Sequence, residues 1–439
     1  MRLSVLGTGY LGATHAACLA AGGHDVVGID TDGSRVAALE RGVPPFHEPG
    51  LVEVLRTGLA EGRLRFSTDV AAAADSDAHF LCVGTPQQPG SHAADLGALW
   101  QAVHALAPLL ERSCVVIGKS TVPVGTAAGL RDVLHGTAPA GEDVHVAWNP
   151  EFLREGHAVE DALHPDRLVL GVESEHAYGV LREVYSRAIA EGVPVVRTDL
   201  ETAELAKVSA NVMLAARISL VNLLAEVCEA ADADVADLTR VLGLDKRIGP
   251  EFLSPGIGYG GGCLPKDTRA FMARARELGV TESAALLREV DATNMRQRSR
   301  TVDLAAQMLD DRLAGARVAV LGAAFKAGSD DVRDSPALDV ATTLCARGAH
   351  VVVHDPQALD NVRRTRPQLG TAEDVEQAVT GAELLLVLTE WPEYASLDPV
   401  SLAGLAAVPR VLDGRLVLDP DKWRAAGWQL CALGRGAVA

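Results

Sequence analysis

The chain begins with an alternating, β-rich run that leads directly into a glycine turn. Residues 2–6 have strand character, the glycines of GTGYLG follow at 7, 9 and 12, and ATHAACLAAGG then has helical character and ends in glycine. A second strand-like run, DVVGID, ends at Asp30. This strand–turn–helix–strand order predicts a βαβ unit, which restricts the beginning of the chain to an α/β fold.

The alternation of predicted strands and helices continues to about residue 198 and is then replaced by a long helical pattern. Short apolar runs at 78–85, 114–121, 143–148 and 167–172 are separated mostly by helical patterns, which predicts a mainly parallel sheet. One long helical pattern at 199–231 follows, and at ~1.5 Å per residue it would span roughly 45–50 Å.

Further helix is expected at 233–243 and 268–313, and the βα rhythm returns from 316. The prediction is three parts: an α/β domain at 1–198, a helical domain at 199–313 and a second α/β domain at 314–439.

The composition excludes several classes of protein. Hydrophobic residues make up 48% of the 439 residues and aromatic residues only 4%, so the core is expected to consist of Ala, Val and Leu. A net charge of -18 argues against a nucleic-acid surface. Seven scattered cysteines without a CxxC pair fit reduced thiols and a cytoplasmic location, and no metal site is expected. Because the sequence opens directly into RLSVLG, no secretory signal is expected.

The long central helix is predicted to lie at an interface. Residues 208–225 are apolar but include Asn211, Arg217, Ser219 and Asn222, so we interpret them as a buried helix and not a membrane span. Arg217 is the only formal charge in that stretch, which is more apolar surface than one neighbour can cover. We therefore expect a homodimer formed along 199–231, with larger assemblies left open.

The glycine turn predicts a dinucleotide site. Glycines at 7, 9 and 12 permit a tight turn and a close approach of the backbone to a pyrophosphate at the helix N-terminus. Asp30 would accept a hydrogen bond from a ribose hydroxyl and repel a 2′-phosphate, which favours NAD over NADP, while Arg35 weakens that preference. An ordinary glycine-rich turn is the alternative.

Three further segments place polar side chains after strands or on the long helix. KSTVPVGT sets Thr121 at a strand end, either as a simple polar turn or facing a cofactor. NPEFLREG puts Glu151 and Glu155 four residues apart, so the two side chains would share a face if the segment were helical. That face is either solvated, or one of the two carboxylates is partly buried and acts as a general base with a raised pKa. Lys207 and Asn211 lie on one apolar stripe, either snorkelling or stabilising an oxyanion.

The stretch GIGYGGGCLPKD, residues 256–267, has five glycines in seven residues before Cys263. Such a crowd of glycine indicates either a flexible connection with an incidental cysteine or a backbone that must lie close against something, with a thiol at a fixed point. Lys266 and Asp267 would lie one turn from the thiol if a helix begins near Leu264. FKAGSDDVRDSP, 325–336, would offer Lys326 and Arg333 to a phosphate or carboxylate, or would be a charged turn.

In order along nearly the whole chain, GTGYLG, KSTVPVGT, NPEFLREG, AELAKVSAN, RIGPEFLSPGIGYGGGCLPKD and FKAGSDDVRDSP resemble the motifs of the nucleotide-sugar 6-dehydrogenase family. The resemblance implies two Rossmann-like, doubly wound α/β domains joined by a long central helix and a helical middle domain. It implies NAD as cofactor, UDP-glucose or a related nucleotide sugar as substrate, and a dimer. The segment GTPQQPGSHAADL is a poorer match to the family.

The resemblance also implies roles for individual residues. The implied catalytic residues are Cys263 as the thiol, with Thr121, Glu155, Lys207, Asn211 and Asp267 around it. The implied cofactor contacts are Gly7, Gly9, Tyr10, Leu11, Gly12, Asp30, Arg35, Thr85, Thr121, Glu155, Lys266 and Arg333. The implied substrate contacts are Glu151, Phe152, Leu153, Arg154, Lys207, Asn211, Arg247, Phe252, Gly260, Cys263, Phe325 and Lys326.

The family oxidises a primary alcohol to a carboxylate in two hydride transfers, with a thiohemiacetal and a thioester on the cysteine. Three alternatives stay open at this point: the same chemistry on GDP-mannose or a dTDP-hexose, a two-electron dehydrogenase, or a non-catalytic nucleotide-sugar sensor. A two-electron dehydrogenase would need no thiol, and a sensor would be expected to lose Cys263, Lys207 or Asp267.

Overall fold

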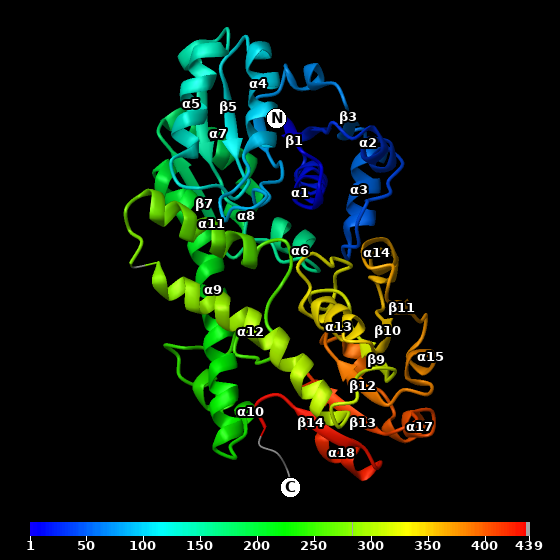
Figure 1. Ribbon diagram of the computed structural model, residues 1–439. Helices are drawn as coiled ribbons and strands as arrows, with labels where there is room; N and C mark the ends of the chain where they lie inside the picture. The colour runs from blue at the N-terminus through cyan, green and yellow to red at the C-terminus, as the bar shows by residue number, and fades with distance from the viewer. Residues whose placement is uncertain (283, 436–439) are drawn as a thin grey trace. The chain divides into compact units, whose positions relative to one another are not determined.

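The computed structural model describes residues 1–282 and 284–435, which fold as two compact units. The first unit holds residues 1–210 and 269–279, and the second holds the rest of the described chain. Figure 1 traces the elements of both. The expected domain boundaries after 198 and 313 stay a prediction.

The first unit is built on an eight-stranded sheet. Its strands, in spatial order, are β3 (Leu64–Ser67), β2 (Asp25–Ile29), β1 (Arg2–Leu6), β4 (Ala78–Leu81), β5 (Cys114–Gly118), β6 (Val144–Trp148), β7 (Leu168–Val172) and β8 (Val195–Thr198). All neighbours pair in parallel except β6 and β7. The first six strands have the order 3-2-1-4-5-6 of a Rossmann fold, so the predicted parallel α/β sheet is confirmed.

Helices cover both faces of this sheet and form a core of mainly aliphatic side chains on each. The helices of one face are α1 (Tyr10–Ala21), α2 (Gly33–Glu40), α3 (Leu51–Ala60), α6 (Ala158–Leu163), α7 (Glu175–Val184) and α8 (Ser186–Ala190). The other face is covered by α4 (Gly97–Leu106) and α5 (Thr126–Thr137). Short 3₁₀ turns are at Val70–Ala73, Ala107–Leu109 and Gly141–Asp143. Parallel strands buried on both faces explain the nearly continuous apolar runs of the sequence.

The second unit contains a six-stranded, entirely parallel sheet. Its order is β11 (Gly370–Thr371), β10 (His350–His354), β9 (Arg317–Leu321), β12 (Leu384–Val387), β13 (Arg410–Asp413) and β14 (Gln429–Ala432). Numbered from its own first strand, this is again the order 3-2-1-4-5-6. Its helices are α13 (Pro336–Ala346), α14 (Leu359–Thr365), α15 (Val375–Val379), α16 (Pro392–Ala395), α17 (Pro399–Ala403) and α18 (Pro420–Ala425). The sheet and these helices share one core.

Four helices make up the predicted helical region: α9 (Leu200–Ala230), α10 (Val235–Gly243), α11 (Leu264–Glu277) and α12 (Ala285–Met308). Of the helices in the described part of the chain, only α9 is long and apolar enough to cross a membrane. Its most apolar 18-residue window is 39% buried, so the expectation of a buried helix is wrong for the chain by itself. Met213, Leu220 and Val227 are 71%, 57% and 55% exposed.

Candidate active site

A cleft at the carboxyl ends of β1, β2 and β4 has the form of a dinucleotide site. It has a volume of about 610 Å³ and is lined in part by Gly7, Gly9, Asp30 and Arg35, which the sequence assigned to the cofactor. Gly7 has a φ of +88°, which favours glycine. A Cβ on Gly12 would lie 1.8 Å from the Gly7 carbonyl oxygen, so the turn can close onto α1 only without side chains here.

Asp30 is held at the end of β2 by several donors. Its Oδ2 accepts from the backbone N–H of Thr8 at 2.8 Å and from the Thr8 hydroxyl at 3.0 Å, and Arg35 Nη1 lies 2.9 Å from the same oxygen. Burial alone would raise the pKa of Asp30, but backbone N–H groups of Asp32 and Thr8 and the Arg35 guanidinium outweigh it and lower the pKa. The cleft therefore presents a carboxylate whose charge is partly matched by Arg35.

The ends of β4 and β5 form the next part of this edge. The Thr85 hydroxyl donates to the Thr121 carbonyl oxygen at 2.7 Å. The Ser120 hydroxyl donates to the carbonyl oxygens of Leu81 and Val83, at 3.2 and 2.6 Å. Thr85 and Thr121, two of the implied cofactor contacts, are thus brought together, with Thr121 on the turn that follows β5.

The segment 149–156 after β6 is a loop and not a helix, so the condition under which Glu151 and Glu155 would share a helix face is not met. Glu151 Oε1 lies 3.0 Å from Lys207 Nζ, and Glu151 Oε2 accepts from the Leu153 N–H at 2.7 Å. Both members of the ion pair are largely buried, with side chains 13% and 6% exposed. Glu155 lies at the end of this loop and is half-buried. The lysine on the apolar stripe of α9 therefore pairs with a carboxylate and does not snorkel into water.

The rest of that loop is fixed from both sides. Arg154 bonds Asp161 through its backbone N–H and its guanidinium, and the Arg167 guanidinium stacks 3.8 Å from the centre of the Phe152 ring. Buried Glu48 accepts from the N–H groups of Gly156 and Ala158 at 2.7 Å and from the Tyr10 hydroxyl. The sequence reasoning missed Glu48 because nothing in its local pattern links it to residues more than a hundred positions away.

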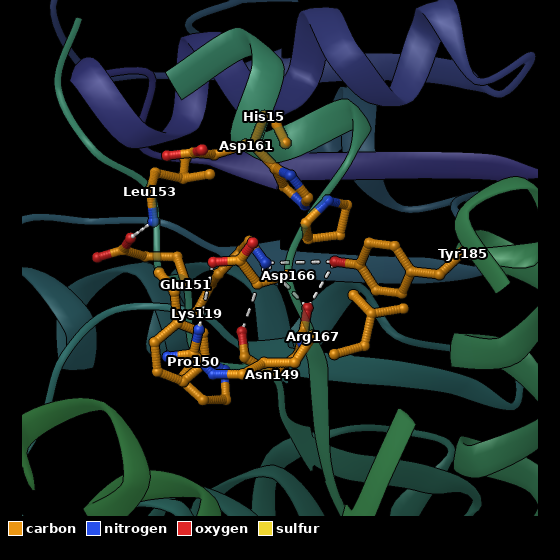
Figure 2. A pocket seen from close by; sticks show the side chains of 14 residues that line it. His15, Lys119, Asn149, Pro150, Glu151, Leu153, Asp161, Asp166, Arg167 and Tyr185 are labelled. Atoms are coloured by element: carbon orange, nitrogen blue, oxygen red, sulfur yellow. Dashed lines mark hydrogen bonds and ion pairs between the residues drawn. The ribbon is translucent and has the colours of Figure 1, made fainter. Parts of the chain in front are cut away.

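A small cavity lies behind the loop, and Figure 2 shows the side chains that line it. Lys119, Asn149 and Tyr185 meet there through hydrogen bonds, and His15 of α1 also lines the cavity. Burial lowers the pKa of Lys119 to about 8 and lowers that of His15. The sequence analysis named none of these four residues, although a lysine directly after an apolar strand is a visible feature of KSTVPVGT.

In the second unit, Cys263 stands immediately before α11, which begins at Leu264 as expected. The Asp267 N–H donates to the Cys263 carbonyl oxygen at 2.9 Å, so the two residues share the first helical turn. Asp267 is 1% exposed, and its carboxylate accepts hydrogen bonds from Asn211 Nδ2 and Lys266 Nζ, both at 2.6 Å. Cys263 is the one exposed cysteine among the seven, and none of the seven forms a disulfide bond.

The glycines before Cys263 lie close against protein. A Cβ on Gly260 would be 2.2 Å from the Asp334 carbonyl oxygen, one on Gly261 would be 2.8 Å from the Phe325 ring, and one on Gly262 would be 2.5 Å from Arg333 Cζ. The space beside these three glycines is thus occupied by the segment after β9, and the close approach that the sequence predicted is explained by packing within the chain. The loop is a closely packed, largely buried support for the thiol.

Other predicted residues of the second unit are also located. The Arg333 guanidinium bonds Asp331, Lys326 Nζ lies 5.8 Å from the centre of the Phe325 ring, and Arg247 is exposed and bonds Asp245. Phe252 has a φ of +57° and is 40% exposed. Such backbone strain in a bulky residue is concentrated at functional sites.

The acidic residue after β10 corresponds to Asp30 but has a different environment. Asp355 Oδ2 accepts from the N–H groups of Ala323 and Ala324 and from Trp391 Nε1, at 2.7, 3.0 and 3.1 Å. Its other oxygen accepts from two further backbone N–H groups, and the residue is 2% exposed. Asp355 therefore has no room for a ribose.

The predicted site residues fall into two sets. The first unit holds the glycine turn, Thr121, the loop from Glu151 to Glu155, and Lys207. The second unit holds Asn211, Cys263 and Asp267, with the residues around them. Lys207 and Asn211 stand one turn apart on α9. The catalytic, cofactor and substrate roles of these residues stay predictions.

The strand order, the glycine turn and Asp30 define a protein with a Rossmann-type dinucleotide-binding domain. Three family profiles match along the chain: the NAD binding domain of the UDP-glucose/GDP-mannose dehydrogenase family at 1–189, its central domain at 201–296, and its UDP binding domain at 319–420. The chain belongs to the UDP-glucose/GDP-mannose dehydrogenase family. It is an oxidoreductase that uses NAD and acts on a nucleotide sugar, as the resemblance implied.

Relatives match over nearly the full length. A UDP-glucose 6-dehydrogenase of Rhizobium meliloti is 39% identical and covers 99% of this chain and 100% of its own. One from Haloferax volcanii is 42% identical, with coverages of 95% and 97%. The structure of a UDP-glucose dehydrogenase from Pyrobaculum islandicum has a TM-score of 0.91 at 38% identity, covering 99% of this chain and 98% of that one.

Proposed function

We propose that this protein oxidises the C6 alcohol of UDP-glucose to a carboxylate with two NAD⁺, giving UDP-glucuronate. In balance, one sugar, two NAD⁺ and one water give the carboxylate, two NADH and three protons. The observation that carries the proposal is Cys263, an exposed thiol that directly precedes α11, with the buried Asp267–Asn211 pair one turn away. Helix N-termini favour thiolates, and only a four-electron oxidation needs a nucleophile here.

The first half of the mechanism is a hydride transfer. Residues Gly7–Gly12 would hold NAD, which supplies the hydride acceptor when bound, and a base would take the hydroxyl proton as the hydride leaves C6, so that an aldehyde remains. The Cys263 thiolate attacks the aldehyde carbon and forms a C–S bond, and the resulting alkoxide is stabilised by Lys207 and Asn211. The pairing of Lys207 with Glu151 supports this role, because the carboxylate keeps the ammonium charged within a buried site.

In the second half, the thiohemiacetal alkoxide on Cys263 would lose its hydride to a second NAD⁺ held by the same glycine turn and would become a thioester. Water then adds to the thioester carbon, the C–S bond breaks, and the thiolate leaves. Glu155 and Asp267 are the two candidates for moving protons and positioning this water.

The decisive experiment is a panel of nucleotide sugars assayed for NADH. UDP-glucose, UDP-N-acetylmannosamine, GDP-mannose and a dTDP-hexose are each incubated with protein and excess NAD⁺, and NADH is counted per sugar consumed. We expect UDP-glucose to be the best substrate and to give two NADH. One NADH per sugar, or none with any sugar, would refute the proposed function.

We also propose a cytoplasmic homodimer formed along α9. Met213, Leu220 and Val227 are spaced by seven residues and exposed, with Leu223 beside them at 45% exposure. This spacing is that of a self-pairing seam, and an isologous contact would bury it without a membrane. Leu220→Glu should convert a dimer to a monomer by light scattering at micromolar concentration; a monomeric unmodified protein with full activity would contradict the dimer.

A further inference from the structure

A buried polar cluster joins the ends of β5 and β6. Lys119 follows β5, Asn149 follows β6, and Tyr185 follows α7. Lys119 Nζ lies 2.9 Å from Asn149 Oδ1 and 3.2 Å from the Tyr185 hydroxyl oxygen, and that hydroxyl donates to Asn149 Oδ1 at 2.5 Å. Figure 2 shows these three side chains pointing toward one another across the cavity behind the loop. Lys119 is 6% and Asn149 1% exposed.

The orientation of the Asn149 amide is fixed by its other contacts. Its Nδ2 donates to the Val169 carbonyl oxygen of β7 at 2.9 Å, so Oδ1 must face Lys119. Its backbone N–H donates to the Gly118 carbonyl oxygen at 2.9 Å. Lys119 therefore binds an acceptor that is already anchored to the strands on both sides, and the ammonium fixes one chain segment relative to another.

The cluster lies directly behind residues of the proposed mechanism. Lys119 precedes Thr121 by two residues, and Asn149 precedes Glu151 by two. Glu151 in turn holds Lys207 at 3.0 Å. A short chain of contacts thus runs from the buried ammonium to the turn with Thr121 on one side and to the Glu151–Lys207 pair on the other.

Packing alone does not explain a lysine here. Among the described residues, none of the ion pairs includes Lys119, so its charge is buried with only neutral partners at hydrogen-bond distance. An unpaired buried charge costs several kcal/mol, and an apolar side chain of similar volume is often as stable or more so. The lowered pKa of Lys119, which burial causes, reflects that cost.

We propose that Lys119 is a positioning residue for the oxidation: its ammonium ties the Thr121 turn to the loop that carries Glu151, and so sets Lys207 in place. The proposal rests on the proposed function, because Lys207 acts there on the oxyanion. A purely structural lysine would instead change stability and leave the kinetics of the folded protein unaltered.

The test is Lys119→Met in the full-length protein. Methionine keeps the length and volume, and Tyr185 still donates to Asn149 Oδ1, so this oxygen keeps a donor, while the Asn149 carbonyl oxygen loses a long contact of 3.5 Å with Lys119 Nζ. We expect a melting temperature equal to or above that of the unmodified protein and an NAD dissociation constant within twofold. We expect kcat with UDP-glucose to fall at least about 30-fold, ~2 kcal/mol, with a smaller change in KM. A kcat within threefold of the unmodified value would overturn the proposal.

A second readout does not depend on activity. Amide hydrogen exchange over 150–156 should be at least tenfold faster in Lys119→Met, while exchange over 7–12 stays unchanged. An unmodified protein that oxidises no nucleotide sugar would refute the proposed function, and exchange would still decide on Lys119. Unchanged exchange over 150–156 refutes the positioning role.

Should Lys119→Met fail to fold, Tyr185→Phe decides, because it deletes one donor to Asn149 and keeps the ammonium. We expect a kcat three- to tenfold below that of the matched variant Tyr178→Phe, whose hydroxyl is on the neighbouring helix α7 and outside the cluster. Equal kcat values for the two variants would overturn the proposal.

Discussion

Asp267→Asn tests how the buried carboxylate beside Cys263 contributes to the reaction. Each carboxylate oxygen of Asp267 accepts one hydrogen bond, from Asn211 Nδ2 or from Lys266 Nζ, and the residue is 1% exposed. An amide in its place has one oxygen and one NH₂, and both neighbours are donors. Whichever way the amide turns, its NH₂ faces a donor. Lys266, whose side chain is 27% exposed, can turn to water, so the amide oxygen is expected to keep Asn211.

The magnitude follows from these contacts. Hydrogen bonds to a charged group contribute about 1.5–3 kcal/mol each, so loss of positioning alone would lower kcat about 10- to 150-fold. Proton transfer by a placed side chain contributes about 10²- to 10⁴-fold. Asp267 serves both purposes in the proposed mechanism, so we expect kcat to fall by ~10³-fold or more, with the KM for UDP-glucose changed about fivefold at most.

The assay is steady-state NADH formation with UDP-glucose at saturating NAD⁺, with two matched variants. Lys266→Met removes the same ion pair and leaves the carboxylate, and it should lower kcat less than tenfold. Glu155→Gln changes the other candidate acid–base group, and the larger of the two losses identifies the residue that moves the proton. Asp267→Asn with more than a tenth of the original kcat, or Lys266→Met with an equal loss, would refute the reasoning.

Three other predictions follow from the site and the core. Cys263→Ala and Cys263→Ser should both lose turnover by several orders of magnitude, and the serine variant should keep cofactor and sugar binding, because a serine hydroxyl ionises far less than a thiol. The intact mass of each variant after incubation with substrate and NAD⁺ reports any covalent species. Near-normal formation of two NADH per sugar by the alanine variant would exclude the thiol as nucleophile. Asp30→Ala should shrink a preference for NAD over NADP that we expect to be at least ~100-fold in kcat/KM; equal use of both cofactors by the unmodified protein would contradict the role given to Asp30. Burial lowers the pKa of His79 to about 3, so the imidazole binds a proton more tightly in the unfolded chain, and the free energy of unfolding should fall by up to roughly 5 kcal/mol as the pH drops from 6.5 to 3. In denaturant unfolding, His79→Gln should lose less stability over this pH range than the unmodified protein. Identical pH profiles of the two proteins would refute this prediction.

The fold could be predicted because its main elements are encoded locally. Buried parallel strands such as β5 and β6 are apolar along their whole length, and the helix after GTGYLG follows a strand and ends in glycine. The strands that the sequence reasoning missed are the marginal ones. β3 alternates in burial, β11 has two residues, and β8 and β14 are short edge strands. Their pairing depends on the neighbouring strand and not on their own composition.

The candidate site was predictable at the level of motifs and less so at the level of contacts. The position of Cys263 next to the start of α11 follows from local helix signals. The contacts of Glu48 with Gly156, and of Lys119 with Asn149 and Tyr185, join residues 30 to more than 100 positions apart. No periodicity connects such residues, so only the folded chain shows them. The glycine-rich loop illustrates the same limit, since its pattern predicted a close approach but not what is approached.

The difference between Asp30 and Asp355 has a consequence for the timing of the reaction. Asp30 borders a cleft, whereas Asp355 is 2% exposed and each of its oxygens accepts at least two hydrogen bonds from the loops around it, so Asp355 offers no carboxylate to a dinucleotide ribose. Under the proposed function, two NAD⁺ must then occupy the first cleft in succession. NADH has to leave and NAD⁺ enter while the half-oxidised sugar waits on Cys263. The lifetime of that covalent adduct must exceed the cofactor exchange time, and the ratio of these two times sets how much free aldehyde escapes per turnover.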